Sequence, residues 1–219
     1  MTQSPTRRCP WNLPQKPEKA GTPWQLQGCF PHVMIADIGK VLFHESTILA
    51  RLDEIAAEIT KDYRGREITV VGILNGSCLF LGDLLRRIPL PLKVDCLAVA
   101  SYHGGTKSTG TVSFRQHELP DVAGRHVLIV DDILDTGRTL AAVKRTFMAT
   151  GSVESVHSCV LLDKNVPREE DVISDYVGFT IPNEFVVGYG LDYMGHYRNL
   201  PFIGVLTEEA IARQGASLH

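Results

Sequence analysis

Residues 127–139 read VLIVDDILDTGRT, the pattern of a buried strand that ends in two carboxylates and leads through a polar turn into a helix. The aliphatic run at 127–130 is typical of a parallel strand covered on both faces. We expect this strand over 127–131, so that Asp131 and Asp132 stand at its carboxyl end, where open α/β sheets bind ligands. The turn at 135–139 and the helix expected over 140–149 offer N–H groups and hydroxyls to an anion. The sequence therefore predicts a ligand site with a phosphate subsite.

Strand and helix patterns alternate along the rest of the chain. A helical periodicity begins at Ser46 and stops at Gly65. The other expected elements are strands at 67–73, 93–100, 156–162, 175–180 and 185–187 and helices at 78–88 and 207–213. Alternation of this kind implies crossover connections, and so an α/β fold with a mainly parallel, twisted sheet flanked by helices.

Composition restricts the organisation and the class of partner. A length of 219 residues with 44% hydrophobic content suits one α/β domain, which we place at 32–219. Residues 1–31 carry six prolines and few aliphatic side chains, so we interpret them as a poorly ordered extension. A net charge of −3 does not favour nucleic acid as a partner, and no apolar run has the length of a membrane helix. The five cysteines include no CxxC pair, which argues against a disulfide framework or a zinc site and suits a reducing cytoplasm.

The segment DDILDTGRT resembles the donor-binding motif of the type I phosphoribosyltransferases, which bind 5-phosphoribosyl-1-pyrophosphate. It matches neither the Walker loop nor the dinucleotide glycine motif. The resemblance implies that Asp131 and Asp132 hold the ribose hydroxyls. It also implies that the 5′-phosphate is surrounded by Asp135, Thr136, Gly137, Arg138 and Thr139. The fold of this family adds to the sheet a small hood, formed by the terminal segments of the chain.

Two further loops resemble those of the hypoxanthine–guanine branch of this family. Residues 72–77, GILNGS, are similar to its pyrophosphate loop, in which Asn75 and Gly76 would contact pyrophosphate. The family usually has lysine where this chain has Asn75, which leaves the effect of this difference open. Residues 101–110 are rich in glycine and hydroxyls and resemble the family's closing loop, with Ser101 and Tyr102 in place of its Ser-Tyr pair. Closure would protect a ribosyl cation from water.

The purine site is implied by two more stretches. Lys164 follows a strand, and in the purine branch the corresponding lysine donates to the oxygen at C6, which suits a 6-oxopurine and not adenine. Residues 184–193 resemble the base-binding stretch, in which Phe185 would stack on the purine and the Val186 backbone would contact its edge. Asp192 would help bind the base and a second magnesium ion, and Arg198 would contact pyrophosphate.

The resemblance implies a purine-salvage glycosyltransferase. It would transfer the phosphoribosyl group to N9 of hypoxanthine or guanine, giving IMP or GMP and pyrophosphate, with Mg²⁺ held by Asp131, Asp132 and Asp192 and with Asp135 as general base at N7. Relatives form dimers or tetramers, so we expect a homodimer or homotetramer. Three alternatives stay open: a xanthine-preferring enzyme, an RNA-binding regulator of pyrimidine attenuation with the same fold, and a non-catalytic binding module. The regulators tend to have tyrosine where this chain has Asp135.

Overall fold

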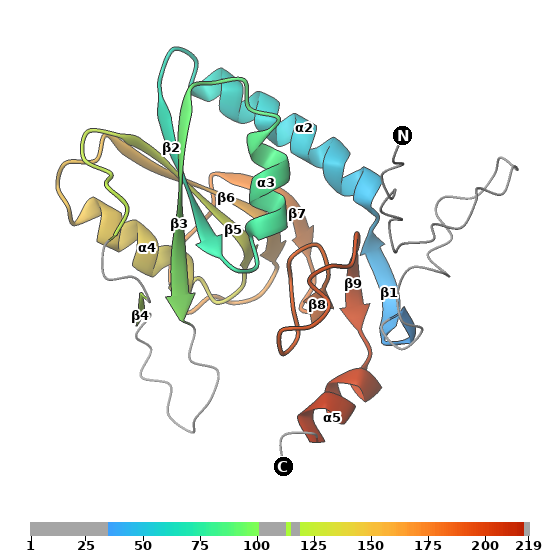
Figure 1. The fold of residues 1–219 in the computed structure, drawn as a ribbon. Coiled ribbons are helices and arrows are strands. Elements are labelled where there is room, and N and C mark those ends of the chain that lie inside the picture. The colour runs from blue at the N-terminus through green and yellow to red at the C-terminus, as the bar shows by residue number, and fades with distance from the viewer. Residues whose placement is uncertain (1–34, 101–112, 115–118, 217–219) are drawn as a thin grey trace, which may run out of the picture.

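Six strands form the central sheet of the protein, drawn in Figure 1. The computed structural model describes residues 35–100, 113–114 and 119–216. The strands are β2 (Ile68–Leu74), β3 (Leu92–Ala100), β4 (Ser113–Phe114), β5 (His126–Leu134), β6 (Ser155–Lys164) and β7 (Tyr176–Ile181). They lie in the order β4-β3-β2-β5-β6-β7, and all neighbours are parallel except β3 and β4. The predicted mainly parallel sheet is thereby confirmed.

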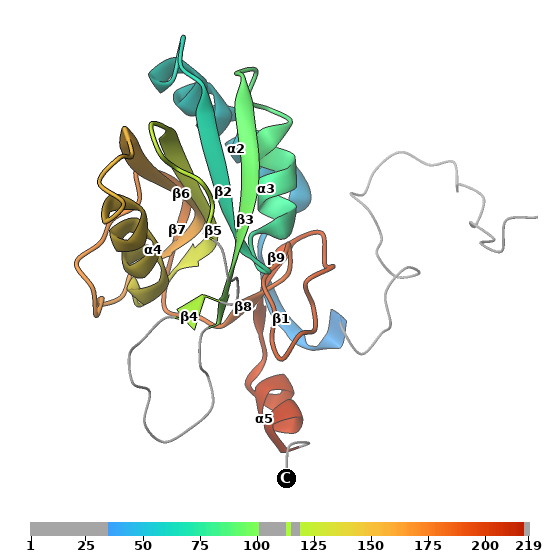
Figure 2. The ribbon, with the colours of Figure 1, turned by 60° about the vertical axis from the view of Figure 1, so that its left-hand side comes forward.

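Helices cover both faces of this sheet. The described helices are α2 (Glu45–Asp62), α3 (Cys78–Leu85), α4 (Arg138–Met148) and α5 (Glu208–Ala216). Figure 2 shows α2 and α3 on one side of the sheet and α4 on the other. Side chains of β2 alternate accordingly, because Ile68 and Val70 pack with α2 and α3 whereas Val71 and Ile73 pack with α4. Burial on both faces explains the continuous apolar runs of the parallel strands.

A second, antiparallel sheet forms the expected hood. It consists of β1 (Ile38–Phe43), β9 (Ile203–Leu206) and β8 (Val186–Val187), in that order. The start of β1 is fixed by Asp37, which accepts a hydrogen bond of 2.6 Å from the Tyr197 hydroxyl and pairs with Arg213 of α5. Segments near both ends of the chain therefore meet beside the central sheet.

The structure corrects several predicted ends: the terminal helix α5 spans Glu208–Ala216 and not 207–213, and β5, α4 and α3 also differ. β5 does not stop at Asp131 but continues to Leu134, because its pairing with β6 extends to Leu134 opposite Asp163. α4 begins at Arg138 and not at residue 140, so that Gly137 directly precedes its first turn. α3 ends at Leu85 instead of 88, where i→i−3 hydrogen bonds and then a proline follow.

In the part of the chain that the structure describes, no helix has the length and apolar character needed to cross a membrane. The extension predicted at 1–31 lies outside the described residues.

Candidate active site

Two adjacent carboxylates, Asp131 and Asp132, lie in the carboxyl-terminal half of β5. Asp131 is buried and Asp132 partly buried. Each accepts a hydrogen bond from the next main-chain amide, at 3.0 Å from Asp132 N to Asp131 Oδ1 and 2.9 Å from Ile133 N to Asp132 Oδ1. These short local contacts fix the orientation of both side chains at the carboxyl edge of the sheet.

The environment of this pair disfavours its negative charge. Burial, and then the charge of Asp132, raises the pKa of Asp131 well above that of an ordinary aspartate. Burial also raises the pKa of Asp132, against the lowering effect of hydrogen bonds and of the Arg198 guanidinium. This adjacent pair of carboxylates, one buried and one partly buried, fits a cation and a diol, both of which interact favourably with carboxylate oxygens.

The loop after β2 passes directly over Asp132. A Cβ added to Gly76 would lie 1.6 Å from Asp132 Oδ2, so a larger residue fits here only if the loop or the carboxylate shifts. Ser77 anchors the loop through a 2.5 Å hydrogen bond from its hydroxyl to the Ile73 carbonyl, and the Leu74–Asn75 peptide bond is cis. The Asn75 side chain is exposed. The predicted pyrophosphate loop and the acidic pair are therefore in direct contact through Gly76.

The turn after β5 leads into an uncapped helix. Gly137, at φ +83°, precedes α4 in the left-handed region that favours glycine. No side chain caps the amino terminus of α4, and its first turn carries no acidic residue. The first-turn N–H groups and the helix dipole can therefore act on an anion held against Thr136 to Thr139.

Lys164 and Asp135 form an ion pair. Lys164 Nζ lies 2.9 Å from Asp135 Oδ2, and the lysine side chain is 11% exposed against 46% for the aspartate. The parallel register explains the contact, because Leu134 of β5 stands opposite Asp163 of β6 and each is followed by one member of the pair. Sequence reasoning gave these residues separate roles and missed their contact, although the alignment of two parallel strand ends could have indicated it.

The hood supplies the other side of the site. Phe185 is 43% exposed and meets Tyr193 edge to face, with ring centroids 5.1 Å apart, whereas Val186 is buried in β8. A Cβ on Gly190 would lie 2.1 Å from the Gly76 carbonyl oxygen, so the 184–193 stretch lies directly on the loop after β2. The hood therefore closes over the acidic pair from the side of Gly76.

Arg198 and Asp192 are joined within the hood. Arg198 Nη2 lies 2.7 Å from Asp192 Oδ1, and Nη1 donates to the Gly190 carbonyl at 2.7 Å. Asp192 Oδ2 accepts a hydrogen bond of 2.7 Å from Gly195 N. Among the described residues, no group of three or more His, Cys, Asp or Glu side chains is placed to hold a metal ion by itself. Asp192 is thus engaged with Arg198 and not gathered with the acidic pair on β5.

Ser101 and Tyr102 of the predicted closing loop lie outside the described residues. A segment that sequence reasoning missed, residues 168–172, packs against the turn, because Glu169 N and Glu170 N donate to the Thr136 carbonyl at 3.1 and 3.3 Å. Its acidic run at 169–171 faces the basic residues of α4, and that charge pattern was a usable signal.

The family model of the phosphoribosyl transferase domain matches residues 41–194. A hypoxanthine-guanine phosphoribosyltransferase of Streptococcus pneumoniae is 47% identical over 173 residues, 79% of this chain and 96% of the relative. One from Lactococcus lactis is 48% identical over 172 residues, covering 78% and 93%.

Solved structures agree in fold. A hypoxanthine phosphoribosyltransferase from Staphylococcus aureus superposes with a TM-score of 0.76 at 45% identity, covering 81% of this chain and 96% of that one. A Trypanosoma cruzi hypoxanthine phosphoribosyl transferase gives a TM-score of 0.76 at 36% identity, covering 82% and 96%.

Proposed function

This chain belongs to the phosphoribosyl transferase domain family, in its hypoxanthine-guanine phosphoribosyltransferase branch, and we propose that it transfers the 5-phosphoribosyl group of 5-phosphoribosyl-1-pyrophosphate to a 6-oxopurine. Hypoxanthine gives IMP and guanine gives GMP, each with pyrophosphate, in a reaction of purine salvage. The observation that carries the proposal is the Lys164–Asp135 pair, which places a purine-reading donor and a candidate base 2.9 Å apart at the ends of two neighbouring strands.

The donor site is assigned to β5 and the turn after it. Asp131 and Asp132 accept hydrogen bonds from the ribose 2′- and 3′-hydroxyls, since carboxylates only accept and a diol donates twice. The uncapped start of α4 and the hydroxyls of Thr136 and Thr139 bind the 5′-phosphate, together with Gly137 and Arg138. Main-chain amides at Asn75 and Gly76, with Arg198, bind pyrophosphate; the exposed Asn75 side chain brings no charge to it.

Mg²⁺ is assigned to the same edge of the sheet. Asp131 and Asp132 fit one ion in donor chemistry, since Mg²⁺ is bound by one or two carboxylates and completes its shell with water and substrate oxygens. Asp192 would reach a second ion once its bond to Arg198 is exchanged. When bound, magnesium neutralises negative charge on the departing pyrophosphate.

The base site lies between Lys164 and the hood. Lys164 donates to O6 of the purine, Phe185 stacks on the ring with its exposed face, and the Val186 main chain together with Asp192 borders the base edge. As the bond at the anomeric carbon breaks, N9 forms the new bond and Asp135 takes or relays the proton of N7. Lys164 keeps Asp135 in place for that step through their ion pair.

We place the enzyme in the cytoplasm.

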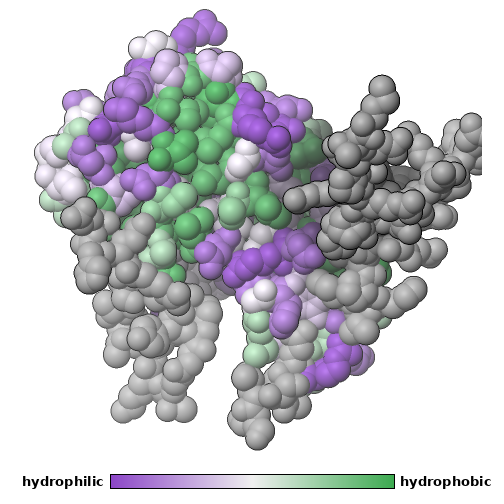
Figure 3. All heavy atoms as spheres, in the orientation of Figure 1, coloured by the Kyte–Doolittle hydropathy of each residue, from purple (hydrophilic) through white to green (hydrophobic). Residues whose placement is uncertain are grey.

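We expect two copies of the chain to associate through the face formed by α3 and β3. Figure 3 shows apolar side chains gathered over these elements, and Leu79 and Val94 are 42% and 48% exposed. Charged residues of both signs surround this face, as in the pairs Arg86 with Asp83 and Lys93 with Glu67. The same face of a second copy can therefore pack against it without like charges meeting throughout. Light scattering of Val94→Lys tests this: a monomer supports the dimer, and an unchanged mass contradicts it.

The reaction itself is tested with purified protein, magnesium and 5-phosphoribosyl-1-pyrophosphate. Nucleotide formation is followed spectrophotometrically with hypoxanthine, guanine, xanthine and adenine in separate cuvettes. Turnover of hypoxanthine or guanine without adenine supports the proposal and the role of Lys164. Turnover of xanthine alone would correct the substrate, and failure with all four bases would contradict the proposed activity.

A further inference from the structure

The turn assigned to the 5′-phosphate packs against a second segment of the chain. Residues 168–172, named here the brace, lie against it: Glu169 N and Glu170 N both donate to the Thr136 carbonyl, at 3.1 and 3.3 Å. A Cβ on Gly137 would lie 2.8 Å from Val172 Cγ1 and 3.1 Å from the Glu170 carbonyl oxygen. The turn and the brace are thus in contact with no space between them.

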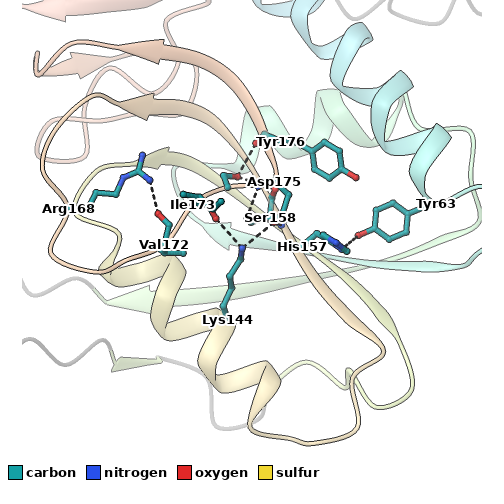
Figure 4. A network of polar contacts seen from close by, with 10 residues as sticks. Tyr63, Lys144, His157, Ser158, Arg168, Val172, Ile173, Asp175 and Tyr176 are labelled. Atoms are coloured by element: carbon teal, nitrogen blue, oxygen red, sulfur yellow. Dashed lines mark hydrogen bonds and ion pairs between the residues drawn. The ribbon is translucent and has the colours of Figure 1, made fainter.

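The Arg168 side chain links the two ends of the brace and ties it to β6. Arg168 Nη1 donates to the Val172 carbonyl at 2.7 Å, and Nη2 forms an ion pair with Asp163 Oδ1. Figure 4 shows the guanidinium of Arg168 turned toward the Val172 carbonyl, across the loop between β6 and β7. Both charged side chains are only about one-fifth exposed. A planar guanidinium can hold a carbonyl and a carboxylate at once, whereas a lysine ammonium is a single point charge.

The position of Asp163 connects this contact to the base site. Asp163 directly precedes Lys164 on β6 and stands opposite Leu134, which directly precedes Asp135. Arg168 is therefore tied to the strand end that carries the purine-reading lysine and, through the brace, to the turn assigned to the 5′-phosphate.

We propose that Arg168 is a positioning residue, which holds the brace against the phosphate-binding turn and thereby sets the affinity for the 5′-phosphate of the ribose donor. This inference rests on the proposed function, because it takes the donor site from there. The contribution is specific for the donor: Lys164 keeps its own bond to Asp135 without Arg168, so affinity for the base changes little.

The chain offers a matched control. Arg145 also contacts the brace, through Glu170 at 2.8 Å, but its side chain is 62% exposed and its hydrogen bonds to the brace go to the Glu170 carboxylate. An exposed ion pair of this kind contributes little. Arg145→Ala removes one arginine and its ion pair with the brace, while the hydrogen bonds from Glu169 N and Glu170 N to the Thr136 carbonyl stay in place.

The experiment compares wild type, Arg168→Ala, Arg168→Lys and Arg145→Ala. KM for 5-phosphoribosyl-1-pyrophosphate and for hypoxanthine are measured separately, together with the Kd for ribose 5-phosphate by calorimetry. We expect Arg168→Ala to raise the donor KM and the ribose 5-phosphate Kd about tenfold with the hypoxanthine KM within about twofold. Lysine should restore less than half of the loss, and Arg145→Ala should match wild type.

A donor KM within twofold of wild type in Arg168→Ala would overturn the inference, as would an equal rise in both KM values, which indicates general loosening of the fold. If Arg168→Ala does not fold, Asp163→Asn replaces it, with a donor KM about threefold higher expected and an unchanged one overturning the inference. Turnover with an unaltered ribose 5-phosphate Kd would leave the proposed function standing and remove the role of Arg168. If no base is turned over but the ribose 5-phosphate Kd still depends on Arg168, the proposed function is contradicted and the role of Arg168 stands.

Discussion

Gly76→Ala is the substitution whose effect the structure specifies most closely. The new methyl group would lie 1.6 Å from Asp132 Oδ2, whereas ordinary contact begins at 3.4 Å, so the loop and the carboxylate must separate by about 2 Å. The backbone of Gly76 is not in the left-handed region, so alanine meets no obstacle there except this carboxylate.

The expected cost falls on catalysis. A displacement of about 1 Å at a reacting centre can lower the rate about 100-fold, or about 2.7 kcal/mol in the barrier. We therefore expect kcat/KM for the ribose donor to fall at least 100-fold, because Asp132 no longer meets the ribose. Overpacking of this kind costs about 1–3 kcal/mol of stability, so the melting temperature should fall by several degrees while the protein remains folded.

The control is Gly82→Ala in α3, six residues away. A Cβ at Gly82 meets no atom of its own chain within 4 Å, and alanine in a helix is favoured over glycine by about 0.5–1 kcal/mol. Its melting temperature should rise slightly, with kinetics unchanged. Initial rates at varied donor concentration give kcat/KM, and thermal melts followed by circular dichroism give the melting temperature. A folded Gly76→Ala enzyme with kcat/KM within threefold of wild type would refute the assignment of Asp132 to the ribose.

Three other changes have defined outcomes. Asp135→Asn should lower kcat by about 10²- to 10⁴-fold while the Kd of the donor stays within about threefold, and unchanged turnover would exclude the role of general base. Lys164→Met should lower kcat/KM for hypoxanthine about 10- to 100-fold, as expected for the loss of one charged hydrogen bond. An equal loss of kcat/KM for a purine that lacks the 6-oxo group would contradict the role of Lys164 in specificity. Burial raises the pKa of Tyr63 to about 12, so the folded state keeps this proton when the unfolded chain has lost it at its ordinary value of 10. The free energy of unfolding should therefore decline as pH rises from 10 towards 12, and it should decline less steeply in Tyr63→Phe. Urea unfolding at several pH values measures it, and an equal pH dependence in wild type and Tyr63→Phe would contradict this.

The central sheet could be predicted from the sequence because its signals are local. The aliphatic runs of β2, β5 and β6 and the helical periodicity of α2 each lie within one short window. The hood was expected only from the resemblance, and no strand was assigned to β1 or β9. Their pairing joins Ile38 with Leu206 across most of the chain and contains register shifts, and neither feature leaves a local pattern.

In the candidate site, too, the features that are local in sequence were predicted and the contacts between distant segments were not. Asp131, Asp132 and the turn after them are contiguous in sequence, and we assigned them together. The Lys164–Asp135 contact depends on the register of two strands, and the brace depends on how the loop after β6 folds back onto α4. Contacts between distant segments of this kind follow from packing, so only the charge pattern of the brace was readable beforehand.

Binding of the ribose donor by Asp131 and Asp132 is the central feature of the proposed site. Calorimetric titration of 5-phosphoribosyl-1-pyrophosphate with magnesium should give one site per chain in the wild type. The variant Asp131→Asn/Asp132→Asn should lose this binding, yet melt no lower than wild type without ligand, because two buried charges are removed and both amide hydrogen bonds can be kept. A folded double variant that binds the donor with unchanged Kd would contradict the account.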